Sequence, residues 1–361
     1  FSINNLLTNQ LLKSLEFELT KAQFRCIEEI NEDVSSPQPM LRLLQGDVGS
    51  GKTIVAVFAL IQAVANNFQT VVMAPTEILA RQHLQNFSNY LSPLGIKVAF
   101  LVGSQNTQER KDQLSLIKTG KAQVVIGTHA LFQENVSFDN LALVVIDEQH
   151  KFGVHQRLAL TQKANMTPHQ LVMTATPIPR SLTMTAYADL DTSIIDELPP
   201  GRQKIETVAL SNLRRDELIT KIKKNSQEGR QIYWVCTLIE ESEALRAESA
   251  EKTFTYLSDN LEDEKVVMIH GRLNKSEKET IMQDFSNGKI DLLVATTVIE
   301  VGVNVPNASL MVVENAERLG LAQLHQLRGR VGRGAEKSVC ILMYQSPLSE
   351  TAKQRLDILR Q

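Results

Sequence analysis

The first segment with recognisable chemistry runs from Gly46 to Thr53 and reads Gly-Asp-Val-Gly-Ser-Gly-Lys-Thr. It follows an apolar run over residues 40–44, which predicts a strand, and leads into an apolar pattern with helical spacing over 53–65. This strand, loop and helix form the context that the G-x-x-x-x-G-K-T motif requires. A glycine-rich turn that only joins a strand to a helix is the alternative, and the Lys-Thr pair argues against it. The segment therefore predicts a site for the phosphates of a nucleotide.

Each residue type in this loop has a role in such a site. Gly46, Gly49 and Gly51 let the backbone bend so that successive N–H groups and the helix N-terminus face the anion. Lys52 is expected to pair with the β- and γ-phosphates of ATP, and the Thr53 hydroxyl to ligate Mg²⁺.

A pair of acidic residues follows a second apolar run, over residues 142–146. Asp147 and Glu148 would leave a buried parallel strand at its carboxyl end, the edge of the sheet at which α/β proteins bind ligands. There Asp147 is expected to hold Mg²⁺, and Glu148 to orient or deprotonate the attacking water. An acidic pair by itself often marks only the end of a strand. Gln149 and His150 are expected near the nucleotide, because no spacing of further ligands completes a metal site around His150.

Two more segments fit a nucleotide hydrolase. Thr174-Ala-Thr176-Pro177 follows another predicted strand and places two hydroxyls beside the expected hydrolysis site. The segment Gln326-Leu-Arg-Gly-Arg330-Val-Gly-Arg333 concentrates arginines in the second half of the chain. A guanidinium that reaches a transferring phosphate from another domain can stabilise its charge, whereas a solvated basic turn is the plainer alternative.

The order of predicted elements places these segments in two domains. Short Val- and Ile-rich runs alternate with helical patterns, which predicts buried parallel sheets of the α/β class. Glu197-Leu-Pro-Pro-Gly-Arg202 interrupts this alternation and reads as a linker, after which the alternation resumes. We therefore expect one domain over 1–200 and another over 201–361. No internal sequence repeat is visible.

The composition sets limits on partners and location. The net charge of −3 gives no sign of a nucleic-acid partner, so local clusters would have to bind one. Three scattered cysteines exclude a disulfide framework and fit the cytoplasm. No apolar run approaches the roughly 18 residues of a membrane span. Because the chain starts at Phe1 and ends within a helical pattern, we expect it to be cut from a longer protein.

Together these motifs resemble the core of superfamily 2 nucleic-acid helicases and translocases, over residues 17–344. The resemblance implies two tandem RecA-like domains with a nucleotide cleft between them. Phe17-Glu-Leu-Thr-Lys-Ala-Gln23 resembles the adenine motif, in which Phe17 would stack on the base and Gln23 would bond its edge. Gly302 and Asn304 match the ribose-contacting position, and Gln326 belongs to the motif that closes on the nucleotide. Thr174 and Thr176 would couple hydrolysis to movement. The residues matching DNA-contacting motifs are Pro75, Thr76, Thr128, His129, Arg272, Thr296 and Thr297.

Within the superfamily, the longer strings resemble the RecG family, translocases that remodel branched DNA in recombination and repair. These strings are Asp147-Glu-Gln-His-Lys-Phe-Gly-Val154, residues 296–306, and residues 314–333. The family of transcription-repair coupling translocases is the nearest alternative, although its acidic motif usually reads Asp-Glu-Glu-Gln. The resemblance implies an ATP- and Mg²⁺-dependent motor on branched, duplex or single-stranded DNA. It further implies a bacterial cytoplasmic protein that acts at the nucleoid as a monomer, with single-strand-binding protein as a possible partner.

Two departures from the family pattern matter. Asn304 stands where an aspartate is usual, so the hydrogen bond to the ribose is kept but its charge is lost. We also expect the family's strand-splitting wedge domain and the hairpin that follows the core to lie outside this chain. These departures raise the alternative of a nucleotide-gated binding module without useful turnover. A phosphotransferase that uses the same phosphate loop is a further alternative, from another class.

Overall fold

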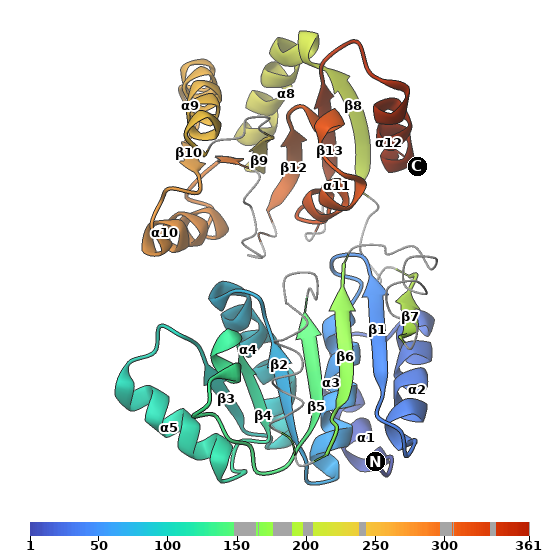
Figure 1. Cartoon of the computed structure of the whole chain (residues 1–361). Coiled ribbons are helices and arrows are strands. Elements are labelled where there is room, and N and C mark those ends of the chain that lie inside the picture. Colours follow the sequence, from blue (N-terminus) through green and yellow to red (C-terminus); the bar gives the residue numbers. More distant parts are fainter. Residues whose placement is uncertain are drawn as a thin grey trace. The chain divides into compact units, whose positions relative to one another are not determined.

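The computed structural model describes residues 1–147, 164, 166–175, 190–197, 205–237, 243–296, 305, 307–332 and 337–360. The chain forms two compact units, Phe1–Pro200 and Gly201–Gln361. Each has its own sheet and hydrophobic cores, so we describe each by itself (Figure 1). The linker predicted around Pro199, Pro200 and Gly201 lies outside the described residues.

The first unit is built on a seven-stranded parallel sheet in the order β3-β4-β2-β5-β6-β1-β7. Its strands are β1 (Leu41–Gly46), β2 (Gln69–Met73), β3 (Val98–Leu101), β4 (Val124–Gly127), β5 (Leu141–Asp147), β6 (His169–Thr174) and β7 (Asp191–Ile195). Its described helices are α1 (Asn5–Ser14), α2 (Lys21–Ser35), α3 (Lys52–Ala65), α4 (Glu77–Leu91) and α5 (Thr107–Lys118), with short 3-10 turns η1 (Ser92–Leu94) and η2 (His129–Phe132).

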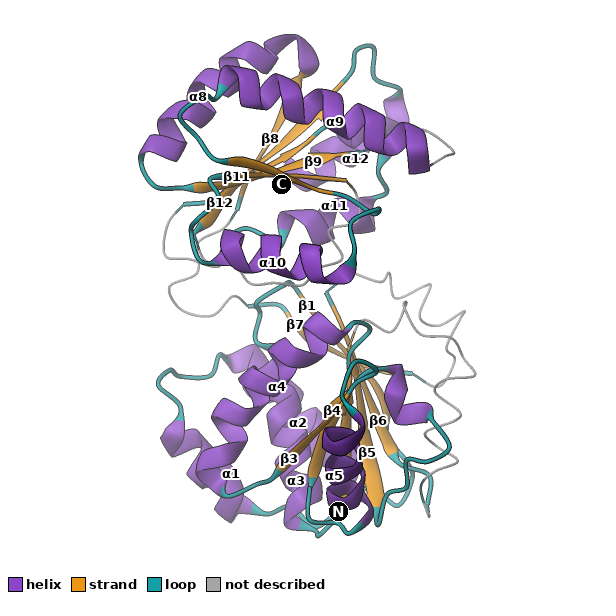
Figure 2. Ribbon diagram, turned by 90° about the vertical axis from the view of Figure 1, so that its left-hand side faces the viewer, coloured by secondary structure: helices purple, strands orange, loops and turns teal. Residues whose placement is uncertain are grey.

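Apolar residues lie on both faces of this sheet, as the continuous apolar runs predict. Because successive side chains of a strand point to opposite faces, Val71 and Val72 belong to different cores. Val72 packs in the core that contains helices α1 to α3, and Val71 packs with Ile117 of α5 (Figure 2). Helix α3 is buried along nearly its whole length, from Ile54 to Val64. The phosphate-loop segment therefore joins a buried strand to a buried helix.

The second unit holds a six-stranded parallel sheet in the order β10-β11-β9-β12-β13-β8. Its strands are β8 (Glu206–Ser211), β9 (Gln231–Cys236), β10 (Val266–Ile269), β11 (Leu292–Thr296), β12 (Ala308–Val313) and β13 (Val339–Tyr344). Its described helices are α8 (Arg215–Gln227), α9 (Glu243–Asn260), α10 (Lys275–Ser286), α11 (Leu321–Arg328) and α12 (Glu350–Arg360), with turns η4 (Asn212–Arg214) and η5 (Ala316–Arg318). Helices α8 and α9 pack on one face, and α10 to α12 pack on the other.

A buried glutamine begins the equivalent strand of each sheet. Gln69 starts β2 and Gln231 starts β9, and each is 3% exposed. In both cases the side-chain amide Nε2 donates to two backbone carbonyls that flank the turn between a helix and the next strand. The acceptors are Ile117 and Ala122 for Gln69, and Phe285 and Ile290 for Gln231, at 2.6–2.9 Å. The two units thus share a packing device although no sequence repeat is visible.

The predicted fold class, two tandem parallel-sheet α/β domains, is confirmed. The strands predicted over residues 40–44 and 142–146 are present within two residues of their expected bounds, as β1 and β5. The edge strands β7 and β8 were not predicted. In the described part of the chain, no helix is both long and apolar enough to cross a membrane. The cysteines Cys26, Cys236 and Cys340 are all buried and unpaired.

Candidate nucleotide and DNA site

The phosphate loop lies between the carboxyl end of β1 and the start of α3. Gly49 and Gly51 have φ angles of 79° and 90°, in the left-handed region that glycine tolerates and other residues avoid. Gly51 is the N-cap of α3, so the unpaired N–H groups of the first helical turn surround the loop. Lys52 Nζ donates to the carbonyls of Gly46 and Asp47, at 2.7 and 2.9 Å. The lysine therefore lies over the loop, where the resemblance expects phosphates.

The loop fits a phosphate group, and two observations carry this. Ser50 is 1% exposed, and its hydroxyl has no hydrogen-bond partner among the described residues, so it is available to a ligand oxygen. A Cβ atom on Gly51 would lie 2.2 Å from Gln23 Nε2, and one on Gly46 would lie 2.5 Å from Ser50 Oγ. Side chains at these two positions would thus collide with the walls of the loop. Thr53, the predicted magnesium ligand, follows Lys52 in the first turn of α3.

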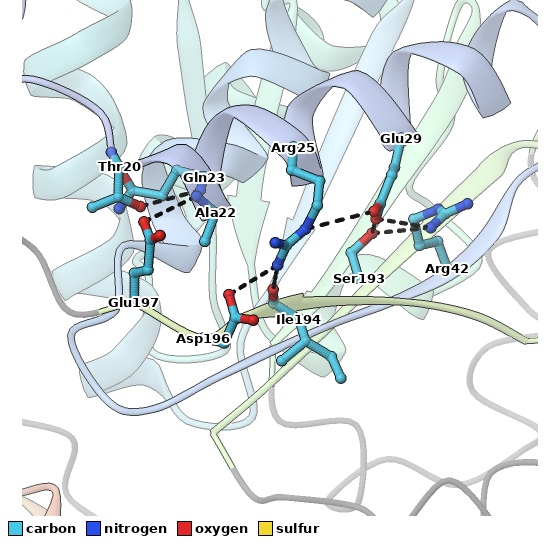
Figure 3. Close-up of polar contacts among 10 residues, drawn as sticks. All are labelled: Thr20, Ala22, Gln23, Arg25, Glu29, Arg42, Ser193, Ile194, Asp196 and Glu197. Atoms are coloured by element: carbon cyan, nitrogen blue, oxygen red, sulfur yellow. Dashed lines mark hydrogen bonds and ion pairs between the residues drawn. The ribbon is translucent and has the colours of Figure 1, made fainter.

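Gln23 braces this loop from the side. It is 2% exposed and forms a capping box with Thr20, in which Gln23 Oε1 accepts from the Thr20 N–H at 2.9 Å. Its Nε2 donates to the Ser50 carbonyl at 2.8 Å. Figure 3 shows Gln23 beside Thr20 at the start of α2. The predicted contact with adenine stays a prediction, and the structure adds that Gln23 holds the phosphate loop. Phe17, the predicted stacking residue, is 43% exposed.

A polar network fixes α2 against β7, as Figure 3 shows. Glu197 Oε2 accepts from the Ala22 N–H at 3.1 Å, so a carboxylate lies at the N-terminus of α2, where the helix dipole favours it. Arg25 Nη2 donates to the Ile194 carbonyl and to Asp196, at 2.7 and 2.9 Å. The hydrogen bond from Arg25 lowers the pKa of Asp196. The helix that carries Gln23 is thereby tied to the strand next to β1.

Arg42 is the buried centre of this network. Its Nε lies 2.5 Å from Asp33 Oδ2, and its Nη1 donates to Ser193 Oγ at 2.9 Å and lies 3.4 Å from Glu29 Oε2. Ser193 in turn donates to Glu29. Burial acts to lower the pKa of Arg42, but the hydrogen bond that Arg42 donates to Asp33 and the charges of nearby carboxylates outweigh it and leave the pKa raised. Arg42 therefore stays charged, and its partners link β1, α2 and β7.

Strand register brings the acidic residue to the phosphate loop. Asp147 pairs with Met173, and Thr174 pairs with Gln45, so the ends of β5, β6 and β1 lie at one edge of the sheet. Thr174 is 2% exposed at this edge. The Asp147 carboxylate is hydrogen-bonded to an unpredicted residue, His83 of α4, whose Nε2 lies 2.7 Å from Oδ2.

A pocket of about 190 Å³ opens beside the loop. It is lined by Gln45, Gly46, Asp47, Ser50, Ala175, Ile194, Ile195, Asp196 and Glu197. No group of three potential metal-binding side chains occurs in the part of the chain that the structure describes. A divalent ion there would take many of its ligands from phosphate and water, as Mg²⁺ commonly does.

The DNA-contacting candidates of the first unit lie at the same edge of the sheet. Pro75 and Thr76 follow β2, and Thr128 and His129 follow the neighbouring strand β4. Thr76 caps α4 by accepting from the Leu79 N–H at 3.4 Å. Thr128 is 3% exposed, whereas His129 is exposed. The strand order thus places these residues on the β4–β2 side, and the phosphate loop on the β1 side.

In the second unit, candidates follow two neighbouring strands. Arg272 is exposed in the turn after β10, and Thr296 ends the adjacent strand β11. Gln326 is half-buried on α11, and Arg330 follows that helix. Eight predicted site residues lie outside the described residues: Glu148, Gln149, His150, Thr176, Thr297, Gly302, Asn304 and Arg333.

The structure identifies three residues that the sequence did not: His83 and Glu197 beside the site, and Arg42, which links β1 to α2 and β7. Arg42 had one visible signal, since a charged residue inside an apolar strand must find partners when it is buried. Glu197 and His83 act on residues 175 and 64 positions away, so no local pattern marks them.

Family comparisons match both units. The DEAD/DEAH box helicase family matches residues 20–185, and the helicase conserved C-terminal domain matches residues 214–335. The ATP-dependent DNA helicase RecG of Escherichia coli K12 is 57% identical over 99% of this chain and 52% of its own length. RecG of Bacillus subtilis 168 is 47% identical over 97% of the chain and 51% of its own length. The chain thus spans about half the length of these relatives.

Solved structures agree with the family comparisons. A RecG bound to a three-way DNA junction superposes with a TM-score of 0.85 at 43% identity, over 99% of this chain and 47% of that one. The Saccharomyces cerevisiae helicase Dbp5, bound to RNA and ADP BeF3, superposes over 98% of this chain and 90% of its own with a TM-score of 0.69. At 17% identity, this second likeness concerns the fold.

Proposed function

Because the chain belongs to the RecG family of ATP-dependent DNA helicases, we propose that it is the ATP-driven motor of such an enzyme. It would couple ATP hydrolysis to movement on DNA and so remodel branched DNA, such as stalled forks and Holliday junctions. The RecG that superposes on it binds a three-way DNA junction, which supports a branched substrate.

One observation carries the proposal. The carboxyl edge of the first sheet holds both the phosphate loop with Asp147 and the hydroxyl-bearing turns that follow β2 and β4. A phosphotransferase needs only the first set. Hydroxyls and backbone N–H groups along one edge suit the phosphates of a nucleic-acid strand, which are contacted without regard to sequence. A chain of net charge −3 is able to bind DNA in this way.

The nucleotide site would act through electrostatics and positioning. Lys52 would exchange its bonds to the loop carbonyls for the β- and γ-phosphates, and Ser50 would supply a buried hydroxyl. Thr53 and Asp147 would hold Mg²⁺, which neutralises phosphate charge when it is bound. Glu148 would orient the attacking water, and Arg330 and Arg333 would stabilise charge on the transferring phosphate.

Movement would follow from alternating affinity for DNA. The hydroxyl-bearing residues of the first unit and Arg272, Thr296 and Thr297 of the second would grip one strand. ATP binding and hydrolysis would draw the units together and release them about the segment after Glu197, a hinge motion that shifts one set of contacts relative to the other. We propose that the motor works as a monomer in the bacterial cytoplasm.

ATP turnover with and without DNA tests the proposal. We expect DNA to raise phosphate release by the wild-type chain. Lys52→Ala is expected to lose roughly 10²–10³-fold, as is typical when one charge-stabilising group is removed. Lys97→Ala, which removes an exposed lysine from the same unit, is the matched control and should keep wild-type turnover.

Three results would contradict the proposal. Full ATP turnover by Lys52→Ala would show that the phosphate loop is not needed for hydrolysis. If forked, duplex and single-stranded DNA all leave ATP turnover by the wild-type chain unchanged, the chain is not a DNA-dependent motor. Transfer of labelled phosphate to an acceptor other than water would identify a phosphotransferase instead.

A further inference from the structure

His83 contacts the predicted magnesium ligand from a helix that the nucleotide motifs do not include. It lies on α4, and its Nε2 is 2.7 Å from Asp147 Oδ2 at the end of β5. Both side chains are well covered, with 10% of His83 and 14% of Asp147 exposed. Because an ionised carboxylate only accepts hydrogen bonds, the imidazole donates from Nε2. The bond therefore fixes one oxygen of Asp147 and the direction in which it points.

The imidazole is itself held in place. The Phe87 ring lies edge-on to it, with 5.7 Å between ring centroids and 61° between the planes. His83 Nδ1 is buried and has no hydrogen-bond partner among the described residues, so within them the imidazole forms one hydrogen bond, to Asp147. Residues that hydrogen-bond to a metal ligand, without touching the metal, commonly fix the orientation of that ligand. The contact of His83 with Asp147 fits this role.

The same helix begins in the DNA-contacting motif. Thr76 is the N-cap of α4, and Glu77 in its first turn pairs with Arg81 at 2.9 Å and accepts from Ser104. His83 follows Thr76 by seven residues, which is about 10 Å along a helix that rises 1.5 Å per residue. A hydrogen-bonded helix moves as one body. A DNA strand that shifts the start of α4 will therefore shift His83, and with it the carboxylate that it holds.

We propose that His83 is a positioning residue that orients Asp147 for Mg²⁺ and transmits DNA binding at the start of α4 to the hydrolysis site. This inference rests on the proposed function, because it assumes that Asp147 holds Mg²⁺ and that Thr76 contacts DNA. In this proposal, helix α4 couples the DNA-contacting residues at the carboxyl edge of the first sheet to the nucleotide-binding residues at the same edge.

Two substitutions separate positioning from packing. His83→Leu fills similar space without a donor. His83→Gln keeps an N–H donor close to the position of the imidazole Nε2 and should restore the contact. His169→Leu is the matched control, because His169 also makes a partly buried hydrogen bond, accepting from the Met40 N–H at 2.9 Å. It lies at the start of β6, the opposite end from the site.

The first readout is equilibrium binding of a non-hydrolysable ATP analogue, measured by calorimetry with Mg²⁺ and with EDTA. The ratio of the affinity with Mg²⁺ to the affinity with EDTA measures how much Mg²⁺ strengthens binding. We expect this ratio to fall roughly tenfold or more in His83→Leu, as is usual when a partner of a metal ligand is removed. Its affinity in EDTA should match that of the wild-type chain. The second readout is DNA stimulation of ATP turnover, which should fall close to unity in His83→Leu while the affinity for DNA is unchanged.

Each outcome decides one question. Recovery of both readouts in His83→Gln, with a wild-type response in His169→Leu, supports the proposal. A normal Mg²⁺ effect and normal stimulation in His83→Leu overturns it, as does a His83→Gln variant that folds and behaves like His83→Leu. If the wild-type chain itself shows no stimulation by DNA, the proposed function fails, and calorimetry still decides whether His83 orients Asp147.

Discussion

Replacing Arg42 with methionine tests how the helix that carries Gln23 is held. The Arg42 side chain is 11% exposed and faces two carboxylates, Asp33 at 2.5 Å and Glu29 at 3.4 Å. Methionine fills much of the space but leaves Asp33 without its cation, and leaves Glu29 with Arg25, whose Nε lies 3.9 Å away. Breaking a buried ion pair from one side costs about 3–5 kcal/mol. Because Asp33 and Glu29 are 22% and 34% exposed and partly hydrated, we expect the lower end, about 3 kcal/mol.

An exposed pair provides the matched control. Arg214 lies 2.7 Å from Glu217, and the two side chains are 55% and 60% exposed. Water already solvates both charges, so Arg214→Met should leave the unfolding transitions close to those of the wild-type chain.

The assay uses the single tryptophan of the chain. Trp234 is fully buried in the second unit, so its fluorescence follows unfolding of that unit, whereas circular dichroism follows both. In urea, Arg42→Met should lower the midpoint of the dichroism change that belongs to the first unit and leave the Trp234 transition in place. A loss below about 1 kcal/mol would refute the buried-pair reasoning. An equal shift of the Trp234 transition would refute the separate stability of the units.

Two other substitutions test the loop and a buried histidine. Gly51→Ala should lower ATP affinity roughly tenfold or more, because its Cβ would lie 2.2 Å from Gln23 Nε2; Gly95→Ala, with a similar positive φ but open space around it, should bind ATP normally. Burial lowers the pKa of His169 to about 4, from about 6.5 when unfolded. The unfolded chain therefore binds the extra proton first, and stability falls as the pH drops from about 6.5 to 4, by ~1–2 kcal/mol allowing for partial exposure. His169→Gln should show a smaller loss in urea titrations at pH 7 and 4.5.

Much of the fold could be predicted, because buried parallel strands leave continuous apolar runs. The run over 142–146 gave a strand that the structure extends by one residue at each end, Leu141–Asp147. The edge strands β7 and β8 were not predicted because they mix polar and apolar residues and are only partly buried. In β7, Ser193 lies buried inside the strand and is acceptable there only because Arg42 and Glu29 bond its hydroxyl. Such compensation depends on distant residues, which no local pattern records.

The candidate site likewise contains residues marked by their local sequence and residues that depend on distant partners. The positions of Lys52, Thr53 and Asp147 could be predicted because they depend on neighbours in sequence, a loop before a helix and a carboxylate after a strand, and their roles stay predictions. His83 could not, since a lone histidine on a helix is usually only a packed residue. Gln23 was predicted for the base, and the structure shows that its amide also holds the Ser50 carbonyl of the phosphate loop.

The paired glutamines, Gln69 and Gln231, point to the ancestry of the chain. Two strands in the same place of two sheets, each begun by an amide that spans the same turn, are the mark of a duplicated domain. In the first copy, the strand β1 runs into the phosphate loop; in the second, its counterpart β8 runs into the basic turn Asn212–Arg214. The two copies share a framework and differ at the carboxyl edge of the sheet, where the first carries the phosphate loop and the second carries the turn Asn212–Arg214.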